Sequence, residues 1–431
     1  MRWSAVMSVS LSALLFHVVL VAFEGPDRYS FVGGLATRMN DLAAALVARG
    51  HRVHHLFVGD PKLPFLEERE GGRLVLERWS QWISAYHLRD VYDGEEGKYF
   101  DFSRTVPPHL ADFVVAPAAA RGERSVLLFE DWQTAAAAIG TATYLQARGL
   151  QSAAIFWNAN NTYGFGRVDF PMLRRAASIT TISRYMRMEL AKVDVEAAIL
   201  PNGIADRWLK LLPPSDPPTL RRSFGDRPTF VKVARFEVDK RWLWAIDAIA
   251  AMRDAGVRPR LIMRGSRSPY ADTVGDRIRA RALSVDRIAL GADATPADLA
   301  AAIATTQADV VFLDFFVAER TLRALYAAAD GVLANSEKEP FGLVGLEVMA
   351  CGGIAYLGRT GEDYAVPFGN SIVIQSDDPR ELATAYGTLR ERRELVTVIR
   401  AEGRATAKRF AWPRILDAYE SAWETAFALT R

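Results

Sequence analysis

The sequence predicts an α/β protein with two Rossmann-like, doubly wound domains in series. Short apolar runs alternate with amphipathic helical patterns along the 431 residues, which is typical of βαβ units around parallel sheets. The length exceeds the roughly 250–300 residues at which a single core stops growing. A proline-rich stretch at 207–228 separates an earlier alternating series from a later one. Ligands of such sheets bind outside the carboxyl ends of the strands, so we expect the functional residues there.

The composition excludes several classes of function. Lys plus Arg total 53 and Asp plus Glu total 51, a net charge of +2, which gives no support to nucleic acid or an anionic membrane as the main partner. The single cysteine, Cys351, permits no disulfide within the chain and indicates a reducing, cytoplasmic compartment. We expect a small buried thiol at Cys351 rather than a nucleophile. The six histidines are scattered without a C-x-x-C motif, so no metal site is predicted.

The apolar stretch at 3–23 opens the first domain and has three interpretations: a signal peptide, a membrane span, or a buried strand in its second half. The strand at 15–23 is preferred because a glycine loop and a helical pattern follow it directly. Further strands of this half are predicted at 52–58, 125–129, 153–157 and 178–182, with a helix at 41–49.

Residues 59–124 are predicted to be an irregular functional insertion or lid. Its aromatic residues either stack on an acceptor sugar or form a small core under the loop; they are Trp82, Tyr86, Tyr92, Tyr99 and Phe100.

The second half repeats the alternation. After the 207–228 linker, strands are predicted at 229–234, 260–263, 309–313, 331–334, 354–357 and 371–374, with helices at 242–253 and 412–427. The predicted domains are therefore 1–206 and 229–408, followed by a terminal helical segment at 409–431.

Two glycines, Gly33 and Gly34, lie between the first strand and the first helix. Glycine lets backbone amides approach an anion closely, and a helix N-terminus favours negative charge. The spacing is not G-x-G-x-x-G, which argues against a dinucleotide-dependent oxidoreductase. A purely structural turn is the alternative.

A basic pair, Arg235 and Lys240, follows the first strand of the second domain. Arginine offers a planar fork for phosphate oxygens and lysine a compact charge. A lysine at a helix start opposes the helix dipole unless an anion is bound. The alternative is a solvated face paired with Glu237 and Asp239.

The stretch SEKEPFGLVGLE (336–347) places two carboxylates around a turn at the carboxyl end of a predicted strand. Pro340 and Gly342 exclude a helix before about Leu343. Glu339 therefore lies in the loop, and Glu347 lies one turn into the helix that begins near Leu343. The amides of the intervening residues lack intrahelical partners; these are Phe341, Gly342, Leu343 and Val344. An anion-binding helix end flanked by carboxylates suits a sugar joined to a diphosphate. The alternative, acidic residues that only stabilise the helix dipole, does not explain the turn.

Taken together, these motifs resemble the retaining glycosyltransferases of family four, which have two Rossmann-like domains (the GT-B fold) and an E-x7-E signature. Besides Glu339 and Glu347, the resemblance covers the glycine loop, LAAALVARGHRV (42–53), PNGI (201–204), Arg235 with Lys240, and FAWPRILDAYESAW (410–423). It implies that the terminal helix crosses back onto the first domain.

The resemblance also implies residue roles. Glu347 would accept hydrogen bonds from the ribose, and Glu339 with the backbone at 341–343 would hold the donor sugar. Arg235 and Lys240 would neutralise the leaving diphosphate, assisted by Gly33 and Gly34. Neither a cofactor nor a metal ion would be required.

Three segments depart from the family pattern. EDWQT (130–134) has Glu130 where the family has histidine, and includes the candidate Asp131. WNANNT (157–162) lacks the histidine that contacts the donor sugar, so Asn160 or Asn161 is expected to replace it. Leu313-Asp314-Phe315 and Arg264-Gly265-Ser266 lack the usual glycines.

We therefore expect a metal-independent transferase that moves a sugar from a nucleotide-diphosphate sugar to a hydroxyl of a sugar or lipid-linked acceptor, in glycan or glycoconjugate synthesis. Its expected location is the cytoplasm, with peripheral association at the inner face of the membrane. Alternatives are a nucleotide-sugar epimerase, a phosphorylase, or a catalytically silent nucleotide-sugar-binding subunit.

Overall fold

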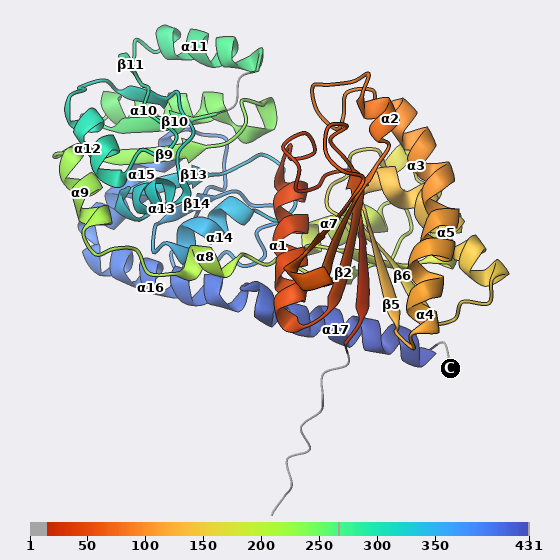
Figure 1. The fold of residues 1–431 in the computed structure, drawn as a ribbon. Coiled ribbons are helices and arrows are strands. Elements are labelled where there is room, and N and C mark those ends of the chain that lie inside the picture. The colour runs from red at the N-terminus through yellow and green to blue at the C-terminus, as the bar shows by residue number, and fades with distance from the viewer. Residues whose placement is uncertain (1–14, 266–267, 430–431) are drawn as a thin grey trace, which may run out of the picture. The chain divides into compact units, whose positions relative to one another are not determined.

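The structure is a computed structural model that describes residues 15–265 and 268–429 (Figure 1). The beginning of the apolar stretch at 3–23, and Ser266, lie outside the described residues. The part that is described includes the predicted first strand, observed as β1 (His17–Val21), whose residues are all buried. No helix in the described ranges is long and apolar enough to cross a membrane.

In the described residues, the first half of the chain contains eight strands and the helices between them. The strands after β1 are β2 (Arg52–Val58), β3 (Leu66–Arg69), β4 (Leu74–Trp79), β5 (Ser125–Glu130), β6 (Ala153–Ala159), β7 (Ser178–Thr181) and β8 (Ala198–Ile199). The helices are α1 (Gly34–Arg49), η1 (Glu70–Gly72), α2 (Gln81–Ser84), α3 (Glu95–His109), η2 (Leu110–Val115), α4 (Ala116–Ala120), α5 (Trp132–Ala147), η3 (Phe165–Arg167), α6 (Phe170–Ala176) and α7 (Arg184–Ala191).

The second half has seven strands in the part that the structure describes. They are β9 (Thr229–Val233), β10 (Arg260–Arg264), β11 (Val285–Ile288), β12 (Val310–Leu313), β13 (Gly331–Ala334), β14 (Ala355–Leu357) and β15 (Ile372–Val373). The helices are α8 (Asp206–Leu209), α9 (Asp216–Ser223), η4 (Val238–Lys240), α10 (Trp242–Asp254), α11 (Tyr270–Ala280), α12 (Pro296–Ala304), α13 (Glu319–Ala328), α14 (Leu343–Ala350), α15 (Arg380–Glu391), α16 (Arg393–Arg409) and α17 (Trp412–Leu429).

Two sheets confirm the predicted fold class. The first has the strand order β3-β4-β2-β1-β5-β6-β7-β8, and the second β11-β12-β10-β9-β13-β14-β15. β1 pairs in parallel with both β2 and β5, and β9 pairs in parallel with both β10 and β13. The carboxyl ends of neighbouring strands therefore meet at one edge of each sheet, where the crevices of doubly wound folds form.

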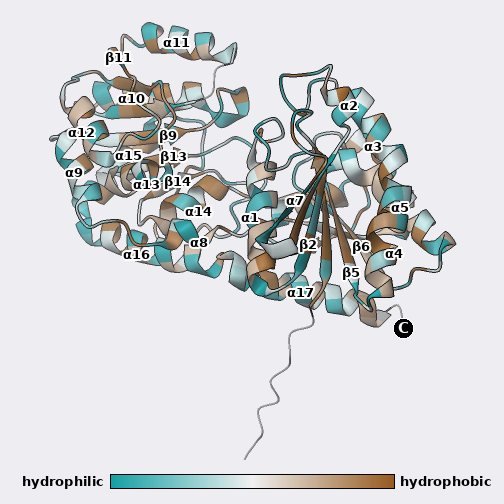
Figure 2. Ribbon diagram, in the orientation of Figure 1, coloured by the Kyte–Doolittle hydropathy of each residue, from teal (hydrophilic) through white to brown (hydrophobic). Residues whose placement is uncertain are grey.

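Each sheet carries a hydrophobic core, and hydrophobic residues are concentrated in the strands (Figure 2). In the first sheet the side chains of 18–22 are fully buried. In the second, Phe230 and Met263 pack with Trp242 of α10 and Ile354 before β14 in one buried cluster. Strands that are buried on both faces read as continuous apolar runs, which explains why the alternation was legible in the sequence.

The prediction that 59–124 is irregular was wrong. β3 and β4 extend the first sheet at its edge, with β3 antiparallel to β4. A long helix, α3, includes Pro107 and Pro108 near its end and continues into the π-helical η2. Prolines normally break a helix interior, so this segment has the composition of a loop although it is largely helical.

The chain divides into two compact units, residues 1–180 with 419–431, and residues 181–418. The segment 207–228 contains the short helices α8 and α9, and the two prolines at 217–218 lie in the first turn of α9, where proline is tolerated. The last helix, α17, begins in the second unit, and its residues from Tyr419 onward belong to the first. There, Glu420 pairs with Arg49 at 2.9 Å, and the ring of Phe427 stacks on Phe16.

Candidate functional site

The loop between β13 and α14 requires glycine at its last position. Gly342 is the N-cap of α14 and has φ 86, a left-handed conformation that side chains disfavour. A Cβ there would lie 2.7 Å from Cγ of Glu362 and 2.8 Å from the hydroxyl oxygen of Tyr364. That hydroxyl donates a hydrogen bond to the Gly342 carbonyl. The helix therefore begins at Leu343, as the sequence predicted, with its first amides at the carboxyl end of the sheet.

The structure brings Lys240 and Glu339 together. The ammonium nitrogen of Lys240 lies 3.5 Å from Oε2 of Glu339 and 3.1 Å from Oδ2 of Asp239. Burial lowers the pKa of Lys240, but the two carboxylates outweigh it and the net shift is upward. The two loops are also joined through backbone, because the Glu337 amide donates to the Asp239 carbonyl at 2.8 Å. Lys240 is therefore a fixed cation next to the start of α14.

The other predicted residues of this unit differ in exposure. Arg235 is exposed and pairs with Glu237 at 3.0 Å, and its positive charge also acts on Lys240. Phe341 is buried and contacts the ring of Tyr364, so only its backbone is suited to a ligand. Glu347 is half-buried on α14, one turn after its start. Leu343 and Val344 are also half-buried.

Sequence reasoning missed Glu362, which supports the loop between β13 and α14. It is 6% exposed and accepts hydrogen bonds from the amides of Gly358 and Thr360, both at 3.2 Å. Burial, together with the charge of Glu339, raises its pKa to about 7. Thr360 in turn accepts a hydrogen bond from the Glu339 amide at 2.8 Å. The only signal was a carboxylate shortly after the apolar run at 354–357.

A second missed residue is Lys232, which is 1% exposed in the interior of β9. Its ammonium group donates to the Leu333 carbonyl at 3.0 Å and to Oδ1 of Asn335 at 3.2 Å. A lysine within the apolar run at 229–234 was the available signal.

In the first unit, the glycine loop is occupied by a carboxylate of the chain itself. Oε2 of Glu24 accepts hydrogen bonds from the amides of Gly33 at 3.0 Å and Ala36 at 2.9 Å. Its other oxygen accepts from the Tyr92 hydroxyl at 2.6 Å. The space around Gly34 is open, since a Cβ there would meet nothing within 4 Å. An anion could use the Gly33 amide only if the Glu24 carboxylate moved away.

The three candidates of this unit form one hydrogen-bonded group at the carboxyl ends of β5 and β6. Asp131 accepts from the backbone amide of Asn160 at 2.8 Å and from the side-chain amide of Asn161 at 2.9 Å. It has φ 62, and strained backbone of this kind is frequent at functional sites. Burial raises the pKa of Asp131 to about 7, and the charge of Glu130 adds to the rise.

The structure explains why glutamate stands at position 130. Glu130 and Arg38 form a fully buried two-point ion pair, with Nη2 to Oε1 at 3.0 Å and Nε to Oε2 at 3.3 Å. Oε2 also accepts from the side-chain amides of Asn158 at 2.9 Å and Asn160 at 2.6 Å. The carboxylate thereby orients Asn160, and a neutral imidazole could not compensate the charge of Arg38.

Three of the five aromatic residues that the sequence analysis named within 80–110 lie on the surface. Trp82, Tyr86 and Phe100 are exposed, at 66%, 83% and 56%. Tyr92 instead donates its hydroxyl to Glu24, and the Tyr99 ring lies 5.4 Å from that of Trp132. The alternative of a small aromatic core is therefore wrong for the three exposed side chains.

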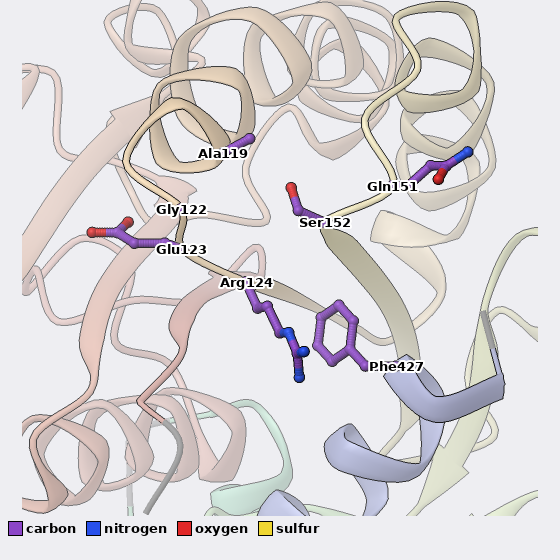
Figure 3. Close-up of a pocket in the computed structure, with 7 residues that line it drawn as sticks. All are labelled: Ala119, Gly122, Glu123, Arg124, Gln151, Ser152 and Phe427. Atoms are coloured by element: carbon purple, nitrogen blue, oxygen red, sulfur yellow. The ribbon is translucent and has the colours of Figure 1, made fainter. Parts of the chain in front are cut away.

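A cavity of about 310 Å³ lies elsewhere in the first unit. It is lined by Glu123, Arg124, Ser152 and Phe427, among others, and Figure 3 shows the Arg124 side chain beside the Phe427 ring. These residues precede β5 and β6 or lie on α17, so the cavity is at the amino ends of the strands, away from Asp131. In the described residues, no group of three or more His, Cys, Asp or Glu side chains could hold a metal ion.

Part of the chain matches a known protein family. Residues 227–392 match the family described as glycosyl transferases group 1. Over 253 residues the chain is 29% identical to a GDP-mannose-dependent alpha-(1-6)-phosphatidylinositol dimannoside mannosyltransferase of Mycobacterium tuberculosis, covering 57% of this chain. The chain spans 58% of that relative's length.

Solved structures match over nearly the whole chain. Sucrose-phosphate synthase of Thermosynechococcus elongatus has a TM-score of 0.66 at 17% identity, covering 96% of this chain and 100% of that one. The Anabaena protein HepE, solved with UDP and glucose, has a TM-score of 0.64 at 18% identity, covering 95% and 100%. At these identities the likeness shows the fold, which is GT-B.

Proposed function

We propose that the whole chain is a retaining glycosyltransferase of family four, a proposal supported by the match of residues 227–392 to the family described as glycosyl transferases group 1. It transfers a sugar from a nucleotide-diphosphate sugar to an acceptor hydroxyl in glycan or glycoconjugate synthesis. The observation that carries the proposal is the Lys240–Glu339 pair, 3.5 Å apart at the start of α14. This corner brings a cation and a carboxylate close to the first amides of a helix, and groups of these kinds suit a sugar joined to a diphosphate.

In the proposed reaction, the acceptor oxygen forms a bond to the anomeric carbon on the face from which the diphosphate leaves. The bond between that carbon and the phosphate oxygen breaks, and the phosphate oxygen takes the acceptor's proton. Lys240 and Arg235 stabilise the charge that develops on the diphosphate. Glu339 and the backbone at 341–343 hold the donor sugar, and Glu347 holds the ribose. Protein cations thus supply the charge stabilisation, and neither a metal ion nor a cofactor is needed.

The first unit is proposed to bind the acceptor near Asp131, Asn160 and Asn161. Gly33 and Gly34 are proposed to contribute to the donor side, which at Gly33 requires the Glu24 carboxylate to move off the amide. The buried, hydrogen-bonded carboxylates there support an acceptor that presents hydroxyl groups. The named relative is GDP-mannose-dependent, which supports a sugar nucleotide as the donor.

A cytoplasmic enzyme that associates with the inner face of a membrane is also part of the proposal. Its support is the exposure of Trp82, Tyr86 and Leu88 on one short segment of the first unit, since aromatic side chains favour the membrane interface. Flotation with anionic vesicles checks it. Binding that persists in Trp82→Ala/Tyr86→Ala would remove this segment from the contact.

The test of activity begins with GDP-, UDP- and ADP-sugars in thermal-shift assays, where a ligand at 100 times its Kd adds about 2.7 kcal/mol. With the stabilising donor, hydrolysis in the absence of acceptor excludes a silent subunit, and an epimerase would convert the donor without a second substrate.

Lys240→Met and Glu339→Gln should each lower turnover about 10²–10³-fold. Lys192→Met, which removes an exposed lysine paired only on its own helix, is the matched control. Unimpaired turnover in either site variant would remove that residue from the mechanism.

A further inference from the structure

Lys232 is a charged group in a place where a charge is costly. It lies in β9 between β10 and β13, with its side chain in the sheet's interior. Removing an ammonium ion from water costs several kcal/mol even after relaxation. Two hydrogen bonds, and the Trp242 ring whose centroid lies 5.5 Å from the ammonium nitrogen, offset only part of this cost. An aliphatic residue would serve the strand better.

The lysine contacts both segments that carry the candidate donor site. It holds Asn335, which begins the loop leading to Glu339. On the other side it faces the ring of Trp242, whose indole N–H donates to the Arg235 carbonyl at 2.8 Å. Movement or loss of this one side chain is therefore transmitted to the loops on either side of the site.

The charges facing Lys232 come from two elements. The η4 segment and the residue after it contribute Asp239, Lys240 and Arg241, and the loop before α14 contributes Glu339. Burial, followed by repulsion from Lys240 and Arg241, lowers the pKa of Lys232 to about 7. Near neutral pH the amine and ammonium forms therefore coexist. An anion bound beside Lys240 would favour the ammonium form.

We propose that Lys232 is a positioning residue of the donor site that takes up a proton when the pyrophosphate of a sugar nucleotide binds, so that donor affinity falls as the pH rises above neutrality. The inference rests on the proposed function, because it requires the anion to lie at the Lys240–Glu339 corner. In the free protein the amine form, which coexists with the ammonium form near neutral pH, avoids a third positive charge next to Lys240 and Arg241. In the complex the ammonium ion adds to the field that holds the diphosphate.

The experiment is calorimetric titration with GDP-mannose and UDP-glucose, whose pyrophosphates do not titrate near neutrality. Titrations between pH 6 and 9 in buffers of different ionisation enthalpy give both Kd and the number of protons taken up. For the wild-type protein we expect net proton uptake near pH 7.5. If donor binding raises the proton affinity of Lys232 about tenfold, the Kd at alkaline pH should be up to about tenfold weaker than the Kd at acidic pH.

Lys232→Met should bind more weakly at pH 6, lose the proton uptake and show a Kd that changes little with pH. Lys232→Arg remains charged throughout, so its Kd at pH 9 should be tighter than that of the wild-type protein. Lys98→Met is the matched control, because Lys98 is also fully buried but lies in the first unit and donates to backbone carbonyls there. It should leave the proton uptake unchanged.

Glu362 is the competing source of a proton, since its carboxyl group also titrates near neutrality beside Glu339. Proton uptake that persists in Lys232→Met and disappears in Glu362→Gln would overturn the inference. If Lys232→Met does not fold, absence of net uptake by the wild-type protein, or a Lys232→Arg profile identical to wild type, would overturn it. Should neither sugar nucleotide bind the wild-type protein at any pH, the proposed function fails as well. If a sugar nucleotide binds and the Kd of Lys232→Met depends on pH as the wild-type Kd does, the inference is overturned but the proposed function is not.

Discussion

The buried pair of Arg38 and Glu130 permits a quantitative prediction. The two side chains are 1% and 0% exposed, and Glu130→Gln removes the negative charge while keeping the size of the side chain. The guanidinium of Arg38 is then left charged in the interior. In the wild-type protein burial lowers the pKa of Arg38 and Glu130 raises it above its ordinary value. In Glu130→Gln the contribution of Glu130 is lost, but the guanidinium stays charged because arginine is not deprotonated in proteins.

Breaking one partner of a buried ion pair costs about 3–5 kcal/mol. The unit that contains the pair comprises 1–180 and 419–431, a size at which 1 kcal/mol shifts Tm by about 2–4 °C. We therefore expect the first unit of Glu130→Gln to melt about 6–20 °C below wild type. Asn160, which donates to Glu130 at 2.6 Å, should also lose its orientation, so acceptor KM should rise.

The assay is urea and thermal unfolding followed by tryptophan fluorescence and circular dichroism. The matched control is Glu96→Gln, because Glu96 forms the same two-point pair with Arg167 but its side chain is 63% exposed. Exposed pairs contribute about 0.2–1 kcal/mol. The double variant Arg38→Met/Glu130→Gln should recover most of the stability, because it removes the buried charge while the glutamine oxygen can still accept from the side-chain amides of Asn158 and Asn160.

The reasoning would be refuted by a Glu130→Gln protein that loses no more stability than Glu96→Gln. It would equally be refuted by a double variant less stable than the single one. In either case the pair would not be the desolvated contact that the distances indicate.

Two further predictions concern the loops. Gly342→Ala should lower the free energy of unfolding by about 2–5 kcal/mol and abolish sugar-nucleotide binding, because it adds a steric overlap to a left-handed backbone. The control Gly352→Ala, at φ 75 with nothing within 4 Å of its Cβ, should cost only about 1 kcal/mol. Equal losses of stability in urea melts would contradict the steric overlap at Gly342. Asp131 has a folded-state pKa of about 7 against 3.8 for the isolated side chain, so the folded protein holds the extra proton and its stability falls as pH rises from about 4 to 7. Relative to wild type, Asp131→Asn should therefore gain about 1–3 kcal/mol on going from pH 5 to pH 8, and a pH-independent difference in the free energy of unfolding would show that the carboxyl group is not buried as described.

The sequence alone determined the fold class and the loop between β13 and α14 in the candidate site. Strands buried on both faces are continuous apolar runs, so β1, β5, β9 and β13 were legible from hydropathy. The corner at Glu339 and Gly342 was predictable because proline and glycine restrict the backbone locally, whatever surrounds them. The same reasoning failed at 59–124, where prolines within α3 have the local character of a loop and only packing makes the segment helical.

The tertiary structure decided which charges meet. Glu24 could not be placed on the amides of Gly33 and Ala36, nor Arg38 on Glu130, because 92 residues separate that pair and only the β2-β1-β5 strand order brings the two elements together. Lys232 could be recognised as an ionisable residue within a strand, but its hydrogen bonds to Leu333 and Asn335 depend on the pairing of β9 with β13. Local sequence restricts backbone conformation, whereas desolvation and charge interactions depend on neighbours that the chain supplies only after folding.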